Sequence, residues 1–382
     1  MKMKQWFWLL LLLVCVQPVG ARRSERKARL RMQERAAACD SVRSLIYMIG
    51  DGMGLAHVSL LQISEGYENR VAFDRAENIA LIRSYSANNR VTDSGAAGTA
   101  LATGHKTNND MLGVLPDSTA VESMMEKAVR RGMTTGIVTT CYINHATPGA
   151  FYGHQIYRRT LEPIADQFVA SGIDVAFGGG RRYFSSVRED GRIPVERLRE
   201  KGYRVIDSLS QADTIRSGRV VGLFASKHLP YAHKGRGNYL PEAVDKALEI
   251  LSNNAEARNS GFMLMVEGSM IDYVSHDNDA EAIVAEMRDF NRAVRAAMDF
   301  VDAHPGTLLV VTSDHETGGL TLPSGDADFS KAESGVLTVF GSTSHTAVML
   351  PVYLYGTGAE RINGVMENTE LANRLMTLLG LE

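Results

Sequence analysis

The chain has 382 residues, of which 45% are hydrophobic and 22% charged, an ordinary composition for a globular protein with a large core. Its formal net charge is −3, so the sequence lacks the basic surface expected of a protein with a specific nucleic-acid partner. Gly is abundant with 35 residues and Pro is scarce with 10, which suits many tight turns between strands and helices.

An export signal is predicted at the start of the chain. Lys2 and Lys4 flank the start of an apolar run over residues 6–16 that is too short to span a bilayer. Small residues follow at the end of residues 1–21, which we therefore predict to be a cleaved signal peptide. The mature protein is then expected in the periplasm or the medium, without a stable membrane span.

A basic segment follows at residues 22–40 and is interpreted as a linker or arm. Seven Lys and Arg residues between positions 22 and 35 oppose translocation, so a retained N-terminal anchor is the alternative. After cleavage the chain would keep only Cys39 and Cys141, which excludes a disulfide scaffold and leaves their pairing open.

Residues 41–382 are predicted to form one α/β domain. Apolar segments alternate with helical patterns such as those at 121–131 and 242–251. The predicted strands cover residues 44–49, 81–85, 134–140, 173–177, 220–224, 262–266, 307–311 and 348–355. This alternation is typical of a three-layer α/β/α sandwich with a mostly parallel central sheet.

Several predicted strands run into acidic or imidazole side chains next to glycines. Asp51, Glu267 and the adjacent Asp314 and His315 all stand at such positions. Open α/β sheets bind ligands at the carboxyl ends of their strands, so these side chains are expected at one edge. A structural explanation also exists, since Asp51 could simply cap the next helix.

Further candidate ligands lie close to predicted strands. Asp272 and His276 are four residues apart, so a helix would place them on one face at metal-binding separation, although such pairs also form simple ion pairs. His345, taken alone, is a loop histidine. Together the three Asp, one Glu and three His offer oxygen and imidazole ligands, which suit Zn²⁺ together with Mg²⁺ and exceed the needs of one zinc ion.

The segment VTDSGAAGTALATGHKT at residues 91–107 predicts a turn followed by a helix of small residues. Ser94 in its first turn faces unpaired backbone N–H groups, which favour a bound anion and a partly ionised hydroxyl. The structural alternative is a serine that caps the helix. Arg158 and Arg159 follow later, and an Arg can bind a phosphate through two parallel hydrogen bonds, although two arginines on a helix are usually surface charges. A nucleophilic serine, a cluster of metal ligands and an arginine that binds an anion together suit hydrolysis of an anionic ester.

These motifs resemble those of alkaline phosphatases, in the family's order, over residues 44–355. The resemblance rests on the segment at 91–107 and on IGDGMG, HATP, FGGGRRYF, LFASKHLPY, VEGSMID and TSDHETGG. It implies a phosphate monoester hydrolase with two Zn²⁺ and one Mg²⁺ that acts on small-molecule substrates through a phosphoserine intermediate. The segment between 316 and 345 is short for the family, so a reduced crown insert is expected, and with it an uncertain interface in a homodimer.

The resemblance implies a role for each candidate residue. Ser94 would be the nucleophile, and Arg158, oriented by Asp93, would bind two phosphate oxygens. The zinc that activates Ser94 would be held by Asp51, Asp314 and His315. The second zinc would be held by Asp272, His276 and His345. Magnesium would be held by Thr147 and Glu267 together with Asp51.

Two positions near the substrate vary within the family. His145 stands where some members have an Asp near magnesium, and Tyr273 where others have Lys or His near the phosphate. A neutral phenol there means one cation fewer, so we hypothesise weaker inhibition by phosphate and a shifted alkaline optimum. The polar loop at 232–238 is either close to the substrate or only solvated.

Three other functions fit part of the pattern. A phosphodiesterase or phosphonate hydrolase shares the two-metal core but often uses Thr as nucleophile. An arylsulfatase needs a modified Cys or Ser followed by Pro and Arg, which the residues after Ser94 lack. A non-catalytic phosphate- or metal-binding descendant would be expected to have lost part of the set, which is complete here.

Overall fold

The structure is a computed structural model that describes residues 41–328, 330 and 335–382. The predicted signal peptide, the basic linker and Cys39 lie outside these residues. Within the described ranges, no helix is long and apolar enough to cross a membrane.

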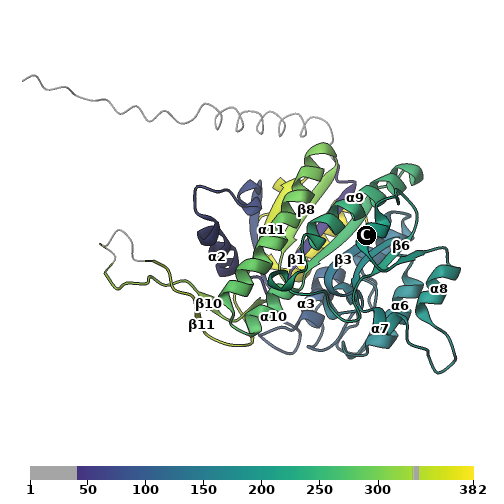
Figure 1. The fold of residues 1–382 in the computed structure, drawn as a ribbon, viewed down its shortest axis with the longest axis horizontal. Coiled ribbons are helices and arrows are strands. Elements are labelled where there is room, and N and C mark those ends of the chain that lie inside the picture. Colours follow the sequence, from purple (N-terminus) through teal and green to yellow (C-terminus); the bar gives the residue numbers. More distant parts are fainter. Residues whose placement is uncertain (1–40, 329, 331–334) are drawn as a thin grey trace, which may run out of the picture.

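A ten-stranded sheet forms the middle of the molecule (Figure 1), in the order β14-β2-β13-β8-β1-β7-β3-β4-β6-β5. Its strands are β1 (Ser44–Gly50), β2 (Asn78–Arg83), β3 (Thr134–Tyr142), β4 (Val175–Gly179), β5 (Arg204–Ile206), β6 (Val220–Leu223), β7 (Phe262–Gly268), β8 (Thr307–Thr312), β13 (Leu350–Gly356) and β14 (Gly364–Glu367). Only β13 pairs antiparallel, with β2 and β8, among the strands of this sheet in the described residues. The mostly parallel sheet is confirmed.

Helices cover both faces of the sheet, and α9 and α11 lie over its strands in Figure 1. One face carries α3 (Ser94–Thr103), α4 (Met124–Arg130), α5 (Ala146–Gly149), α6 (Leu161–Ser171), α7 (Arg181–Phe184), α8 (Pro194–Glu200) and α12 (Asn368–Leu379). The other carries α2 (Leu55–Glu65), α9 (Tyr239–Arg258), α10 (Met270–His276) and α11 (Ala280–Ala303). These layers confirm the predicted α/β/α sandwich.

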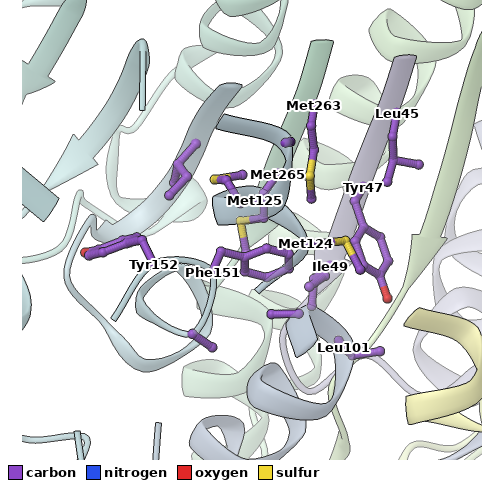
Figure 2. Packing of buried hydrophobic residues seen from close by; sticks show 14 of the residues in the cluster. Leu45, Tyr47, Ile49, Leu101, Met124, Met125, Phe151, Tyr152, Met263 and Met265 are labelled. Atoms are coloured by element: carbon purple, nitrogen blue, oxygen red, sulfur yellow. The ribbon is translucent and has the colours of Figure 1, made fainter. Parts of the chain in front are cut away.

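The two apolar cores share the central strands. In β1, Tyr47 and Ile49 face one core, whereas Ile46 and Met48 face the other, because successive side chains of a strand point to opposite faces. Figure 2 shows Tyr47 among Met124, Leu101 and Phe151, and the Tyr47 and Phe151 rings meet edge to face with centroids 6.1 Å apart. Burial on both faces explains why β1 has an unbroken apolar sequence.

Four short strands and four 3-10 helices complete the described elements. β9 (Glu316–Thr317) pairs with β12 (His345–Thr346), and β10 (Leu320–Thr321) pairs with β11 (Val339–Phe340). These two small sheets occupy the segment for which a reduced insert was expected. The 3-10 helices are η1 (Ala72–Arg75), η2 (Leu209–Ala212), η3 (Ala232–Lys234) and η4 (Ala359–Arg361).

Some predicted boundaries were wrong by a few residues. The strand predicted at 81–85 is β2, which begins at Asn78 and ends at Arg83. Its more exposed and buried side chains alternate, so a search for an apolar segment detects only the end of the strand. The helix predicted at 121–131 begins at Met124, because Ser123 and Glu126 form a capping box. The helix predicted at 242–251 extends over the whole of α9.

Candidate active site

The predicted site residues gather at the carboxyl edge of four adjacent strands. β8, β1, β7 and β3 are neighbours and parallel, and Ile49 of β1 pairs with Glu267 of β7 and with Thr312 of β8. Asp51 follows β1 directly and Asp314 follows β8 after Ser313, so both lie at the same edge of the sheet as Glu267, the charge of which acts on Asp51. The register of a buried parallel sheet therefore brings together acidic residues from distant parts of the chain.

Three groups of side chains offer ligand atoms that lie within 4.8 Å of one another. Two groups match the predicted zinc sets, namely Asp51, Asp314 and His315, and Asp272, His276 and His345. The third combines Glu267 with His145 and Cys141, neither of which was predicted as a ligand. Thr147 lies in α5 and is fully buried.

Many polar atoms of this centre are buried without a hydrogen-bond partner in the described part of the chain. They are Oδ1 and Oδ2 of Asp51, Oδ2 of Asp314, Oε1 of Glu267, Oγ1 of Thr147 and Nδ1 of His145. Buried polar atoms without partners are costly and rare in native proteins. Divalent cations would supply partners for these atoms, so the residues present fit bound metal ions.

Without nearby positive charge, the carboxyl groups also disfavour the ionised forms of one another. Burial raises the pKa of Asp51, and the nearby Asp314 and Asp272 raise it further. Burial and the charge of Asp272 raise the pKa of Asp314 to about 6. Such clustered carboxyl groups are stable as anions only beside cations, which again favours a metal centre.

The imidazole rings at Asp272 have a defined orientation. His276 Nδ1 donates to the carbonyl oxygen of Thr343 at 2.7 Å, and His345 Nδ1 donates to that of Thr92 at 2.9 Å. Carbonyl oxygens only accept, so each ring has its proton on Nδ1 and, when neutral, presents the Nε2 lone pair as a ligand. These Nε2 atoms lie 3.3 and 3.6 Å from Asp272 Oδ1.

Thr317 orients a further ring, a role that the sequence motifs did not predict. Its Oγ1 donates to Asp272 Oδ1 at 2.6 Å and lies 3.1 Å from His315 Nδ1, from which it therefore accepts. His315 Nε2 is left as an acceptor, 3.1 Å from Ser94 Oγ. The only signal in the sequence was that Thr317 belongs to the TSDHETGG block.

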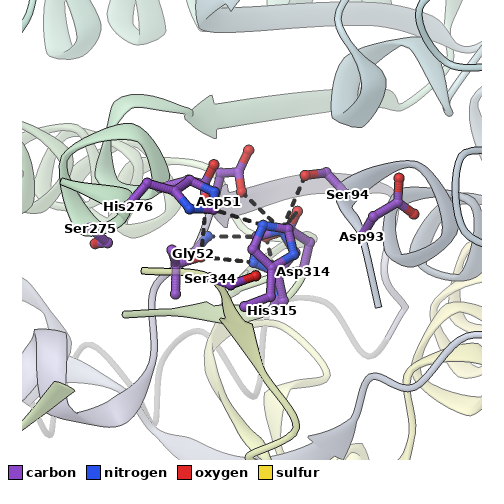
Figure 3. Close-up of polar contacts among 12 residues, drawn as sticks. Asp51, Gly52, Asp93, Ser94, Ser275, His276, Asp314, His315 and Ser344 are labelled. Carbon is purple, nitrogen blue, oxygen red and sulfur yellow. Dashed lines mark hydrogen bonds and ion pairs between the residues drawn. The ribbon is translucent and has the colours of Figure 1, made fainter. Parts of the chain in front are cut away.

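Ser94 is the first residue of α3, and its hydroxyl points towards His315 (Figure 3). The helix is capped by Asp93, whose Oδ1 accepts from Ala96 N at 2.9 Å, so the alternative that Ser94 is the capping residue was wrong. Ser94 is 3% exposed. The next residue must be small, because a Cβ on Gly95 would lie 2.9 Å from the Met111 carbonyl oxygen.

Arg158 lies in the turn before α6 and not on a helix. Its Nη1 donates to Asp93 Oδ2 at 2.9 Å, and its backbone N–H donates to the Asp110 carbonyl oxygen at 2.7 Å. Burial alone would raise the pKa of Asp93, but the charge of Arg158 and the N–H of Ala96 lower it. Asp93 therefore holds the guanidinium beside Ser94.

A cavity of about 530 Å³ lies at the exposed side of the site. It is lined by Asp93, Ser94, Asp110, Tyr142, His145, Arg158, Arg159, Leu161, Asp272, Tyr273, His276 and His345. The His145 and Tyr273 rings lie 6.4 Å apart, and burial together with the charge of Arg158 lowers the pKa of His145 to about 3. A neutral imidazole and a neutral phenol thus stand beside the cationic Arg158.

Known proteins are similar to this chain in sequence and in fold. Residues 42–335 match the family model described as alkaline phosphatase. Alkaline phosphatase 4 of Bacillus subtilis is 30% identical over 429 residues, which cover 92% of this chain and 91% of that protein. The alkaline phosphatase of the Antarctic bacterium TAB5 gives a TM-score of 0.83 at 35% identity and covers 90% of this chain and 99% of that one.

A variant of the TAB5 enzyme with a histidine replaced by aspartate, solved with Mg bound in its M3 site, gives a TM-score of 0.81 at 34% identity. That match covers 89% of this chain and 99% of the other. The fold and the buried ligand groups define an α/β hydrolase that binds divalent metal ions. The chain belongs to the alkaline phosphatase family of phosphoric monoester hydrolases.

Proposed function

We propose that the chain hydrolyses phosphate monoesters through a phosphoserine intermediate on Ser94, with two Zn²⁺ ions and one Mg²⁺ ion. The observation that carries this proposal is the position of Ser94 at the N-terminus of α3. Its Oγ lies 3.1 Å from His315 Nε2 in the cavity that Arg158 also lines. An anion bound there meets the positive end of the helix and the guanidinium together.

The buried ligand groups support three cation sites. Asp51, Asp314 and His315 would hold one zinc ion, and Asp272, His276 and His345 the other. Glu267 and Thr147 would hold magnesium with Asp51, which fits the unpartnered oxygen atoms of all three residues. When bound, the cations neutralise charge on the phosphoryl group and lower the pKa of a hydroxyl or water.

Arg158 and Ser94 would act on the substrate in turn. The guanidinium N–H groups not used by Asp93 bind two phosphate oxygens and fix the phosphorus in front of Ser94 Oγ. Oγ then gives its proton to solvent and forms a bond to phosphorus while the bond to the ester oxygen breaks, and the ester oxygen takes a proton from solvent and leaves as the alcohol. Water attacks the phosphoserine, the Oγ–P bond breaks, and inorganic phosphate and the Ser94 hydroxyl result.

His145 and Tyr273 would complete the substrate-binding surface without adding charge. Burial lowers the pKa of His145 and raises that of Tyr273, so both side chains are neutral at the alkaline pH of the reaction. Arg158, which Asp93 holds beside Ser94, is then the cationic side chain that we assign to the phosphoryl group.

The test is phosphate release from p-nitrophenyl phosphate by protein reconstituted with Zn²⁺ and Mg²⁺, before and after chelation. We expect turnover that chelator abolishes and the two metals together restore, and elemental analysis should give two zinc and one magnesium per chain. Acid quenching during turnover of labelled phosphate ester should trap the label on Ser94. No turnover with both metals present, or label on another residue, would overturn the proposal.

A further inference from the structure

The cavity at Ser94 is larger than a phosphoryl group requires. Its volume is about 530 Å³, whereas one water molecule occupies about 30 Å³ of the liquid, so four phosphate oxygens fill only part of it. The remaining wall includes three residues for which the proposed reaction has no use, namely Tyr142, Arg159 and Leu161.

Tyr142 is the last residue of β3 and its ring is held from several directions. The pairing of β3 with β4 shifts register between Val138 and Tyr142, and such irregularities re-aim side chains at strand ends. The ring meets His145 at 89° with centroids 5.6 Å apart. It lies nearly parallel to the His228 ring, at 12° and 6.4 Å. Tyr142 is half-buried and lines the cavity.

The backbone behind Tyr142 is closely packed. Gly180 has a φ of +93°, and a Cβ there would lie 2.7 Å from Asn144 Oδ1 and 3.2 Å from Tyr142 Cβ. Asn144 is fully buried, and its Nδ2 donates to the Leu161 carbonyl oxygen at 2.7 Å. Asn144, two residues after Tyr142, thus holds the backbone at Leu161 before any ligand binds, which lowers the entropic cost of binding.

Aromatic and planar groups continue around this part of the cavity. The His228 ring bridges Tyr142 and Tyr273, with its centroid 5.7 Å from that of Tyr273. Arg159 is exposed at the rim, and no ion pair of its guanidinium is found among the described residues. A guanidinium without a carboxylate partner is available to stack on an aromatic ring.

We propose that Tyr142, with Leu161 and Arg159, forms a leaving-group subsite that favours planar aromatic alcohols such as nucleosides. The inference rests on the proposed function, because it concerns the alcohol part of the same phosphate ester. A base or aryl ring gains stacking contacts on this wall, whereas an aliphatic alcohol such as glycerol gains none. All monoesters bind through the same phosphate-binding residues, so the subsite selects among them by the alcohol group.

The test compares kcat/KM for adenosine 5′-monophosphate and glycerol 2-phosphate in the metal-loaded enzyme. Tyr142→Ala is expected to lower kcat/KM for the nucleotide about tenfold, as expected for loss of one stacked ring, and to change it less than about twofold for glycerol 2-phosphate. Tyr142→Phe should retain both values, because it keeps the ring. Tyr67→Ala, at a tyrosine 76% exposed on the surface, is the matched control.

The inhibition constant for inorganic phosphate should be the same in all these variants, which would show that the phosphate-binding part of the site is intact. Equal losses for both esters, or an unchanged ratio, would overturn the subsite. Failure of every ester to turn over would instead overturn the proposed function. In that case calorimetric binding of the same two esters, with and without Tyr142→Ala, still decides the inference: equal affinity losses refute it, and a loss confined to the nucleotide supports it.

Discussion

The two carboxylate oxygens of Asp93 join the first turn of α3 to the guanidinium of Arg158. Oδ1 accepts from Ala96 N at 2.9 Å, and Oδ2 accepts from Arg158 Nη1 at 2.9 Å. One residue therefore fixes both the helix that begins with Ser94 and the side chain proposed to bind phosphate. Loss of its charge should affect the second contact more than the first, because an uncharged Asn is also a good N-cap.

Asp93→Asn should weaken binding of substrate and product together. The guanidinium loses its anionic partner, so we expect KM and the inhibition constant for phosphate to rise by similar factors, about three- to tenfold. Both constants are measured with p-nitrophenyl phosphate as the substrate. Unchanged constants would show that Arg158 is held in place without the Asp93 charge.

Ser94→Ala should keep its metal ions and lose at least about a thousandfold in kcat, because the proposed nucleophile is removed while the carboxylates and imidazoles remain. Metal content by elemental analysis and phosphate binding by calorimetry should match the unchanged enzyme. Ser59→Ala, on α2, makes the same chemical change outside the cavity and serves as control. Substantial turnover by the Ser94 variant would refute its role.

The central strands were predictable from sequence because parallel strands buried on both faces leave unbroken apolar segments. The acidic residues at the ends of β1, β7 and β8 were found for the same reason. Thr317 was not, because its contact with Asp272 crosses 45 positions and leaves no local pattern. The sequence alone relates Cys141 only to a disulfide, whereas its Sγ lies 3.2 Å from Glu267 Oε2, a neighbour that only the sheet register reveals.

Tyr273→Lys should strengthen inhibition by phosphate. Tyr273 is half-buried and lines the cavity with Ser94 and Arg158, so an ammonium group there adds a cation near the bound anion. We expect the inhibition constant for phosphate to fall about three- to tenfold at pH 8, with a smaller effect at higher pH as the partly buried lysine loses its proton. Tyr273→Phe, which adds no charge, is the control. An unchanged inhibition constant and pH profile would contradict the hypothesis.

Glu126→Gln should destabilise the protein more at pH 6 than at pH 9. His154 Nε2 lies 2.9 Å from Glu126 Oε1, and this contact raises the pKa of His154. Burial alone would raise the pKa of Glu126, but His154 and the Ser123 N–H lower it. The His154 contribution is complete below its ordinary pKa of 6.5 and disappears as pH rises through the folded value. The Glu126 contribution is present above its ordinary pKa of 4.5 and is lost at lower pH.

The measurement is the melting temperature of metal-loaded protein at both pH values, with an expected excess loss of about 1–2 °C at pH 6. Gln can still complete the capping box with Ser123, so the helix start is preserved. Equal losses at pH 6 and pH 9 would mean that the pair contributes through its neutral hydrogen bonds alone.

Arg236 anchors the loop at 232–238 to the protein, so this loop is not merely solvated. Its side chain is 1% exposed and bonds Glu286 and Asp289 of α11, with 2.7 Å between Nη2 and Asp289 Oδ2. Arg236→Met would leave both buried carboxylates without this cation, which typically costs about 3–5 kcal/mol. We expect a large fall in unfolding free energy in urea, whereas Arg216→Met, at an exposed ion pair, should change it little.

The loss in the Arg236 variant should depend on pH. Burial already raises the pKa of Glu286, and removal of the guanidinium raises it further. A carboxyl group whose pKa is higher in the folded than in the unfolded state binds more protons when folded, so it lowers stability as pH rises through that range. The difference from the unchanged protein should therefore be larger at pH 8 than at pH 5.5. A loss of equal size at both pH values would indicate that packing of the Arg236 side chain, and not compensation of buried charge, holds this loop on α11.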